Sequence, residues 1–479
     1  MNFFDAFACQ ARHQPTAPAI CAPGRPHGLI SYGRLRALAN NIARNSLSAG
    51  IRRGHTVALC CDDPVLHWAM ILGLAHLGAV TVSCHDAALP TECPVDAILT
   101  SVPDRFPNAH RVMRIGDDWI AGDGKPPEAE PERDRYATAR IILTSGTTGR
   151  SKAVALSHDI IVRRLQAFDV AFGNRIPACT RTFVDVGITA NIGFLWGLYM
   201  LARGGTLFLR GNEPAETMQA FTLYGVQCMI ASPGGMAEFL DYYERSPAFA
   251  SPFEVIMSVG SLLSKPLAER VRASLSTHVV SGYGATEGNP VAAAPWHHLG
   301  GLAGAVGYVA PGMIVEAADR QDRALPAGSE GLIRFRGHTC VSSYVGNPPG
   351  SDTFFRDGWF YPGDIGRVTD DGVLVISGRE KTIIDLGGDK ISPEAIEAVL
   401  MSYPGVILAA ALGRPNALGL EEVYAAVVAR STIDLAALRN HCAGRLAPAQ
   451  IPGRIIQVPE IGRNAAGKID RRALQHLFV

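Results

Sequence analysis

The stretch LTSGTTGRSK, residues 143–152, decides how the rest of this chain is interpreted. Positions 144–150 hold only Thr, Ser, Gly and one Arg, and Lys152 closes the run. Glycines allow sharp backbone turns, and successive N–H groups in such a turn form an anion-binding nest. The pattern is not a Walker loop, which needs a Gly, four residues and then Gly-Lys-Ser or Gly-Lys-Thr. Composition alone leaves two alternatives open, a surface linker or a cradle for phosphates.

The flanking residues place this run at a predicted strand-to-helix turn. ARIIL (139–143) is a strand candidate, and AVALSHDIIVRRLQAF (153–168) leads into a helix. Upstream, the polar and Pro-rich residues 121–135 predict a solvated loop or tether.

The rest of the chain alternates between strand and helix patterns. Apolar residues at helical spacing predict a helix over 32–50, and TVALCC (56–61) predicts a buried strand that a helix and the strand VTVSC (80–84) follow. Strand, helix, strand in this order predicts a parallel sheet with helical crossovers. Four later segments repeat the strand pattern: TLFL (206–209), CMIA (228–231), EVIMSV (254–259) and HVVS (278–281). Near residue 380 the character changes, and the remainder is long enough for a small domain.

Charge and composition exclude several classes of protein. Lys plus Arg and Asp plus Glu both total 44, which removes the electrostatic argument for nucleic acid or an anionic membrane as the main partner. The longest apolar stretch, GFLWGLYMLA (193–202), is too short to span a bilayer. No secretory signal is visible, and the ten cysteines show no CxxC spacing, so we expect a cytoplasmic protein with reduced thiols.

A second glycine-rich turn follows the strand candidate at 278–281. HVVSGYGATEGNP (278–290) carries Tyr283, Thr286 and Glu287. Read as GxGxxG it would indicate a dinucleotide fold, but Gly288 comes one residue late and no acidic residue follows at the expected distance. A carboxylate beside a Thr suits Mg²⁺ better, because Mg²⁺ takes oxygen ligands next to phosphates.

Two further clusters lie in the last third of the chain. Asp364 follows a Pro-Gly corner, and Arg379 ends an apolar strand candidate. An Asp that accepts from sugar hydroxyls and an Arg near the same sugar are chemically sensible, although solvated turn residues are the commoner interpretation. Lys468 follows a glycine near the C-terminus and, taken alone, would be an ordinary surface lysine.

Together and in this order, the clusters resemble the adenylate-forming superfamily of acyl-CoA synthetases, adenylation domains and luciferases. The resemblance covers nearly the whole chain. Five segments carry it: the phosphate loop TSGTTGRSK (144–152), YGATE (283–287), AGAVGYVAPG (303–312), the pair GWFYPGD (358–364) and GREK (378–381), and NAAGK (464–468).

The resemblance implies an α/β fold in two parts. Residues 1–380 are expected to form a large ATP- and acid-binding domain of parallel and mixed sheets with flanking helices and a small distorted barrel. Residues 381–479 are expected to form a small mobile α+β domain with the catalytic Lys and the thiolation segment. The implied enzyme is an AMP- and pyrophosphate-forming acid–thiol ligase. A carboxylate attacks the α-phosphate of Mg·ATP, and a thiol then displaces AMP from the acyl-adenylate.

The resemblance also implies roles for individual residues. Lys468 would bridge the acid oxygen and the α-phosphate, Thr286 would contact that phosphate, and Glu287 would hold Mg²⁺. Tyr283 would stack on adenine, and Asp364 and Arg379 would bind ribose. The remaining expected positions are the phosphate-loop residues Thr144, Ser145, Gly146, Thr147, Thr148, Gly149 and Lys152, the further nucleotide-site residues Gly260, Ser261 and Gly284, the hinge residue Lys381, and the thiol-tunnel glycines Gly387 and Gly388.

The predicted acid pocket departs from the family pattern. Ile188 and Thr189 replace an aromatic-His pair, whose His normally sits beside the substrate carboxylate. Val259 stands where Gly is usual and adds volume, so we hypothesise a compact acid rather than a long fatty chain. Three more residues are assigned to this pocket: Gly282, Asn191 and Asp185, the last as a candidate partner for an amino group. A satisfied core or surface role is the alternative for Asp185 and Asn191.

Three functions are left open at this stage. An acid–thiol ligase that uses CoA is favoured, because the small domain carries the thiolation segment. The second is a stand-alone adenylation enzyme that loads the phosphopantetheine arm of a separate acyl carrier protein. The third, a non-catalytic nucleotide-binding relative, has no need for Lys468, Glu287 and Arg379. Partners are then a small carboxylic acid, ATP and CoA.

Overall fold

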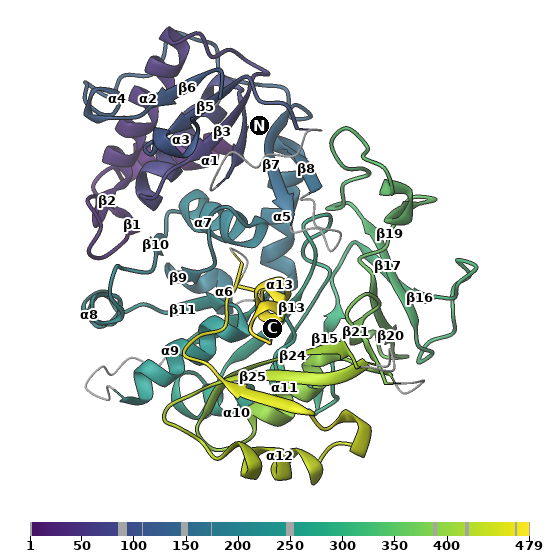
Figure 1. The fold of residues 1–479 in the computed structure, drawn as a ribbon. Helices are drawn as coiled ribbons and strands as arrows, with labels where there is room; N and C mark the ends of the chain where they lie inside the picture. Colours follow the sequence, from purple (N-terminus) through teal and green to yellow (C-terminus); the bar gives the residue numbers. More distant parts are fainter. Residues whose placement is uncertain are drawn as a thin grey trace. The chain divides into compact units, whose positions relative to one another are not determined.

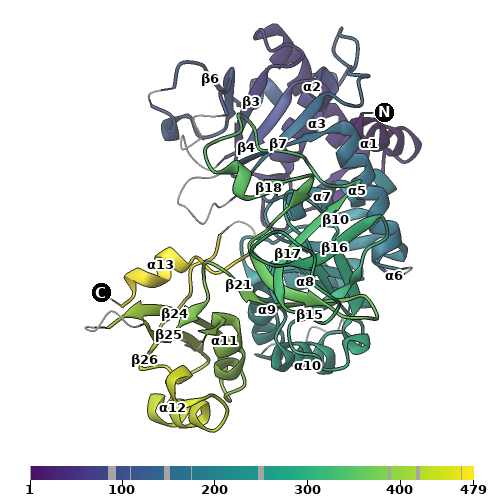
Figure 2. The same ribbon diagram turned by 90° about the vertical axis from the view of Figure 1, so that its right-hand side faces the viewer.

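A computed structural model describes residues 2–84, 93–107, 109–144, 152–173, 175–245, 253–386, 390–416, 421–464 and 467–478. The chain divides into two compact units, both drawn in Figure 1 and Figure 2. Unit 1 comprises Met1–Ile230, Thr286–Asn289 and Gly337–Phe355. Unit 2 comprises Ala231–Ala285, Pro290–Arg336 and Arg356–Val479.

Unit 1 contains a six-stranded sheet with the order β6-β5-β3-β4-β7-β8. Its first five strands pair in parallel, as the strand–helix–strand pattern predicted. The crossover helix α3 begins behind the N-cap Asp63 with Pro64 and ends at Gly78 in the left-handed conformation, so both ends carry standard stop signals. The elements are β3 (Thr56–Cys60), α3 (Pro64–Leu77), β4 (Val80–Ser83), β5 (Ala97–Thr100), β6 (Val112–Arg114), β7 (Thr138–Thr144) and β8 (Lys152–Ser157).

The opening stretch connects two antiparallel strands, so the predicted strand-to-helix turn was wrong. Thr144, the last residue of β7, pairs with Lys152, the first residue of β8. The helix α5 (His158–Ala171) begins only after β8, with Ser157 as its N-cap. The pairing of β7 with β8 therefore holds Thr144 and Lys152, the two described ends of the glycine-rich run, opposite each other.

The remaining elements of unit 1 include a second set of strands in the order β9-β10-β1-β2. The helix expected over 32–50 spans Tyr32–Ser48, and the apolar stretch at 193–202 lies within α7. The bounds are α1 (Phe3–His13), β1 (Pro18–Cys21), β2 (Leu29–Ser31), α2 (Tyr32–Ser48), η1 (Pro103–Arg105), α4 (Asp117–Ile120), α6 (Arg175–Ala178), β9 (Arg181–Asp185), α7 (Asn191–Arg203), β10 (Thr206–Phe208), α8 (Pro214–Tyr224), β11 (Cys228–Ala231) and η3 (Ser351–Thr353).

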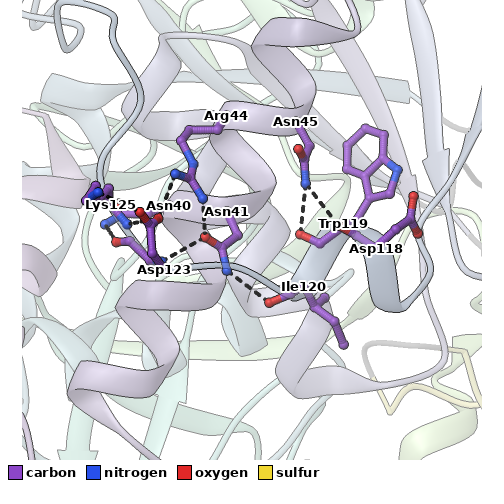
Figure 3. A network of polar contacts seen from close by, with 10 residues as sticks. Asn40, Asn41, Arg44, Asn45, Asp118, Trp119, Ile120, Asp123 and Lys125 are labelled. Atoms are coloured by element: carbon purple, nitrogen blue, oxygen red, sulfur yellow. Dashed lines mark hydrogen bonds and ion pairs between the residues drawn. The ribbon is translucent and has the colours of Figure 1, made fainter.

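The polar segment upstream of β7 is a loop, as predicted, but its first part is tied to α2 (Figure 3). Residues 121–137, all of them described, form neither helix nor strand. Amide side chains of α2 donate to the backbone of this region, Asn40 to Gly124 O at 2.7 Å and Asn41 to Ile120 O at 2.9 Å. Arg44 adds an ion pair with Asp123.

Unit 2 contains an extended sheet in which β12, β13, β14, β15, β21, β20, β17 and β19 follow one another, and β16 pairs with β17. From β13 onward the neighbouring strands run antiparallel. The bounds are α9 (Pro233–Arg245), β12 (Val255–Ser258), α10 (Lys265–Ser274), β13 (Val279–Tyr283), β14 (Ala292–Pro295), η2 (Trp296–Leu299), β15 (Ala305–Val309), β16 (Met313–Ala318), β17 (Gly331–Gly337), β18 (Phe355–Arg356), β19 (Trp359–Phe360), β20 (Asp364–Val368) and β21 (Val373–Arg379).

The C-terminal part of unit 2 has its own apolar core around the sheet β24-β25-β26. Arg430, just after β25, forms ion pairs with Asp241 and Glu244 of α9. The division of the chain at 380/381 remains a prediction, which this separate core supports. The elements are β22 (Ile384–Asp385), β23 (Lys390–Ile391), α11 (Pro393–Met401), β24 (Val406–Pro415), β25 (Glu421–Ala429), α12 (Leu435–Ala443), η4 (Pro448–Gln450), β26 (Arg454–Gln457) and α13 (Arg471–His476).

Within the ranges that the structure describes, no helix combines the length and apolar character that a membrane span requires. The buried sheets and flanking helices of both units give the mixed α/β architecture that the sequence predicts.

A buried histidine at the start of α5 makes the stability of unit 1 sensitive to acid. His158 is 1% exposed, and its Nδ1 accepts a hydrogen bond from Phe3 N at 3.4 Å. Burial lowers the pKa of His158 from 6.5 to about 4. Because the pKa of His158 is lower in the folded protein than in the unfolded chain, protonation favours the unfolded chain. The free energy of unfolding is therefore unaffected by His158 above pH 6.5 and decreases as the pH falls from 6.5 toward 4.

We therefore expect His158→Asn to remove part of the acid sensitivity of folding. Linkage predicts that His158 lowers the free energy of unfolding of the wild-type protein by about 2 kcal/mol when the pH changes from 7.5 to 5. Urea unfolding at the two pH values measures the loss in each protein. An equal loss in wild type and variant would show that His158 is not responsible.

Candidate active site

Lys152 lies beside two aromatic rings of unit 1. It begins β8 opposite Thr144, whose Oγ1 lies 3.4 Å from the Lys152 carbonyl oxygen. The Lys152 Nζ atom lies 2.9 Å from the centroid of the Phe354 ring and 4.8 Å from that of Tyr344. A cation over aromatic rings is held by their negative faces, so the ammonium has a defined place at the end of the hairpin. Ser145, Gly146, Thr147, Thr148 and Gly149 lie outside the described residues.

Tyr344 also binds Glu287, so the predicted phosphate and metal residues meet at one side chain. The Tyr344 hydroxyl donates to Glu287 Oε1 at 2.7 Å, and Val341 N donates to the Glu287 carbonyl at 2.8 Å. Burial and the Glu287 charge both raise the pKa of Tyr344, which keeps its hydroxyl protonated as the donor. Glu287 is 7% exposed, and Thr286 immediately before it is half-buried.

The oxygen ligand at Glu287 fits Mg²⁺. The described ranges contain no group of three or more metal-ligating side chains. Mg²⁺ needs no such group, because it is usually bound by one or two carboxylates together with substrate phosphates and water. A buried carboxylate that Tyr344 orients through one oxygen, while the ring of the same tyrosine lies next to the Lys152 ammonium, meets that requirement.

The sequence interpretation missed Tyr344 and Phe354. Both lie in the turn-rich segment 337–355, and Tyr344 is 57 positions from Glu287. No spacing or composition in that segment marks an aromatic partner for a lysine or a glutamate. Only the folding of unit 1 brings Tyr344 and Phe354 to Lys152, and Tyr344 to Glu287.

In unit 2 the residues predicted for the nucleoside form a second cluster. Asp364 and Arg379 are direct neighbours across β20 and β21, and Arg379 Nε donates to Asp364 Oδ1 at 2.9 Å. The Tyr283 hydroxyl, at the end of β13, donates to the other carboxylate oxygen. Asp364 is 3% exposed, and its charge raises the pKa of Arg379. The cluster thus holds a buried carboxylate between a cation and an aromatic ring.

Other residues predicted for unit 2 lie at or near the ends of β12 and β13. Gly282 and Gly284 flank Tyr283. Gly260 adopts the left-handed conformation with φ 87°, just after β12. The buried Val259 precedes it and donates its N–H to the Ala231 carbonyl at 3.0 Å, and Ser261 is exposed.

Lys468 lies in a tight turn that Asn464 closes. Asn464 N donates to the Lys468 carbonyl at 2.9 Å, and Lys468 N donates to Asn464 Oδ1 at 3.1 Å. Gly467 has φ 74°, and a Cβ there would lie 2.4 Å from Ser232 Oγ. Only glycine fits this position, so the turn lies directly against the residue that precedes α9. Lys381 is exposed in the turn after β21, and Gly387 and Gly388 lie outside the described residues.

The predicted acid-pocket residues of unit 1 differ in their hydrogen bonds. Asp185 accepts two hydrogen bonds from Arg210, at 2.8 and 2.7 Å, so an amino group of a substrate would compete with this ion pair. Ile188 and Asn191 are bound through oxygen atoms by two buried arginines, Arg140 and Arg164. The hydroxyl of Thr189 is buried and has no hydrogen-bond partner among the residues described.

Unit 1 thus holds Lys152 and the buried Glu287 at one tyrosine, and unit 2 holds a cluster of Tyr283, Asp364 and Arg379. Residues 96–345 match the family of AMP-binding enzymes, and residues 395–468 match the C-terminal domain of AMP-binding enzymes. The first match alone covers more than half of the chain. The chain therefore belongs to the AMP-binding enzyme family.

Similar proteins extend over nearly the whole length. A 4-chlorobenzoate–CoA ligase from Arthrobacter sp is 26% identical, with 98% of this chain and 94% of the relative covered. The fatty acid–[acyl-carrier-protein] ligase ScoC from Streptomyces coeruleorubidus is 27% identical, with 98% and 95% covered. The crystal structure of the anthranilate CoA ligase AuaEII with anthranoyl-AMP has a TM-score of 0.85 and 21% identity, over 100% of this chain and 97% of that one.

These comparisons confirm the predicted family and the predicted α/β fold class. They also confirm the enzyme class, an acid–thiol ligase that activates its acid as an acyl-adenylate. The roles of the individual site residues stay predictions, which the two clusters support.

Proposed function

We propose that this enzyme activates a compact carboxylic acid with Mg·ATP and transfers the acyl group to the thiol of CoA. The observation that carries the proposal is the meeting of Lys152 and Glu287 at Tyr344. Tyr344 thus links a cation suited to phosphate oxygens with a buried carboxylate suited to a metal ion, which is the pairing that phosphoryl and nucleotidyl transfer require.

The first half-reaction joins two anions, a carboxylate and a triphosphate. Donors and cations must therefore offset the charge that develops at the α-phosphate. Lys152 is proposed for the β- and γ-phosphates, Thr286 for the α-phosphate, and Lys468 for the oxygen between the acid and the α-phosphate. Mg²⁺ held by Glu287 would supply positive charge to the phosphate oxygens.

The nucleoside is assigned to the cluster in unit 2. The Asp364 carboxylate would accept hydrogen bonds from ribose hydroxyls, and Arg379 would lie beside the same sugar. Because the Tyr283 hydroxyl is bound to Asp364, its ring has one orientation in which to stack on adenine.

Transfer to a thiol is the second half-reaction. We assign it to a rotation of residues 381–479 about Lys381, which lies in the turn directly after β21. CoA is the proposed acceptor, because the 4-chlorobenzoate relative is a CoA ligase. Loading of an acyl carrier protein is the second candidate, and the similarity to ScoC, a ligase of fatty acids and acyl carrier protein, favours it.

ATP–pyrophosphate exchange across a panel of carboxylic acids tests the proposal. We expect exchange to be fastest with compact acids, because the buried Val259 takes up volume at the proposed pocket wall. CoA and a phosphopantetheine-bearing carrier protein are then offered with the best acid. No exchange with any acid would contradict the proposed function.

The size expectation has its own control. Val259→Gly should shift the preference toward longer acids, measured as kcat/KM over a chain-length series. Wild-type turnover that keeps rising into the long-chain acids would refute the compact pocket, whatever the acceptor is.

A further inference from the structure

Arg164, in the second turn of α5, has a guanidinium that the protein covers completely. Its Nε donates to the Thr339 carbonyl at 3.0 Å, and its Nη1 donates to Asn191 Oδ1 at 3.3 Å. Its Nη2 is buried and has no hydrogen-bond partner in the described part of the chain. No described carboxylate forms an ion pair with it, and Glu287 acts on it only through its charge.

This arrangement leaves a buried positive charge without a direct counter-ion. Burial lowers the pKa of Arg164 to about 10, so the side chain stays protonated at neutral pH. An uncompensated buried charge is strongly destabilising, and buried ions in proteins are normally paired and hydrogen-bonded. Because Arg164 is buried without a counter-ion and its Nη2 has no acceptor among the described residues, it is suited to binding an anion that arrives with the substrate.

The neighbours of Arg164 indicate which anion. On one side it binds Asn191, the first residue of α7, two positions after Thr189. On the other side it binds Thr339, in the segment whose Val341 N–H holds the Glu287 backbone. Arg164 therefore connects the predicted acid pocket with the proposed metal ligand.

The same pocket lacks the histidine that the resemblance leads us to expect. Ile188 and Thr189 stand where a histidine would lie beside the substrate carboxylate. The Thr189 hydroxyl is itself buried without a partner among the described residues. Arg164 Nη2 and Thr189 Oγ1 are thus both buried and without a partner among the described residues, on side chains that are bonded to Asn191 or lie two positions before it.

We propose that Arg164 binds the carboxylate of the acid substrate through Nη2 and takes the place of the absent histidine. This inference rests on the proposed function. The guanidinium holds the acid in its ionised form and keeps its own proton throughout. A carboxylate oxygen forms the new bond to the α-phosphorus, and the bond to the β-phosphate breaks, with its electron pair leaving on pyrophosphate.

The test compares Arg164→Met, Arg164→Lys and the control Arg163→Met in ATP–pyrophosphate exchange. Arg163 is the next residue on α5, half-exposed and paired with Asp159, so its variant removes the same charge away from the proposed site. We expect Arg164→Met to raise the KM for the acid about 10- to 150-fold, the loss expected for a hydrogen bond to a charged group. The KM for MgATP should stay close to the wild-type value, and Arg163→Met should resemble wild type.

A higher KM for MgATP with an unchanged KM for the acid would overturn the proposal and make Arg164 a positioning residue for Glu287. If Arg164→Met does not fold, the KM values of Arg164→Lys for the acid and for MgATP are compared in the same way. This variant keeps the positive charge but moves the N–H donors away from the position of Nη2. Normal exchange and an unmoved acid KM would refute this inference alone. Exchange with no acid in the wild-type enzyme would refute the proposed function and the inference with it.

Discussion

Lys468→Ala should slow acyl-adenylate formation severely and leave thioester formation from a supplied acyl-adenylate largely intact. Charge develops between the acid oxygen and the α-phosphate only in the first half-reaction, and one lost donor at such a centre costs about 100- to 1,000-fold in rate. The Lys468 turn is closed by Asn464 and packs against Ser232 through Gly467, so the lysine is held by backbone rather than left on a free tail. ATP–pyrophosphate exchange measures the first step.

The second step is measured by adding synthetic acyl-adenylate and the thiol. Arg472→Ala is the matched control, because it removes one exposed positive charge a few residues further along the same segment. It should behave as wild type in both assays. An equal loss of both half-reactions in Lys468→Ala would show that the lysine supports the fold of the C-terminal part and has no specific role in adenylation.

Glu287→Gln should lower kcat/KM for MgATP about 100-fold or more and raise the Mg²⁺ concentration needed for half-maximal rate. The amide keeps the size of the side chain but loses the charge that a hard divalent cation requires. Tyr344→Phe removes only the hydroxyl that orients Glu287, at 2.7 Å, and we expect about a 10-fold loss, typical of a group behind a metal ligand.

A Mg²⁺ titration of the adenylation rate distinguishes the two variants. Glu287→Gln should need more Mg²⁺ than Tyr344→Phe, and Tyr344→Phe more than wild type. An unchanged Mg²⁺ dependence in Glu287→Gln, even with a reduced rate, would contradict the role of this carboxylate as the metal ligand.

The sequence predicted the strands and helices of the first sheet because their patterns are local. TVALC, the apolar helix after it and VTVS fold as β3, α3 and β4, with helix signals at both ends of α3. The hairpin at the opening stretch was not predictable in the same way. AVALS runs without a break into helical residues, and only pairing with β7 shows that it is a strand.

The candidate site shows the same limit. The sequence assigned Asp364, after a Pro-Gly corner, and Arg379, at the end of a strand candidate, to the same sugar, and strand register makes them neighbours. The contact of Glu287 with Tyr344 depends on a separation of 57 positions, and no spacing announces it. Sequence cannot distinguish Arg164 from its neighbour Arg163, because both are arginines in the same helix. Only the structure shows that Arg164 is buried with an unused donor, whereas Arg163 lies at the helix surface and pairs with Asp159.

The most direct test of the acyl-adenylate mechanism follows oxygen from the acid into the nucleotide. The wild-type enzyme is incubated with Mg·ATP, CoA and an acid whose carboxylate carries ¹⁸O in both positions, and the products are analysed by mass spectrometry. Attack of the carboxylate on the α-phosphate predicts AMP that contains one ¹⁸O atom and pyrophosphate that contains none. Unlabelled AMP, with the label in pyrophosphate or inorganic phosphate, would contradict the account.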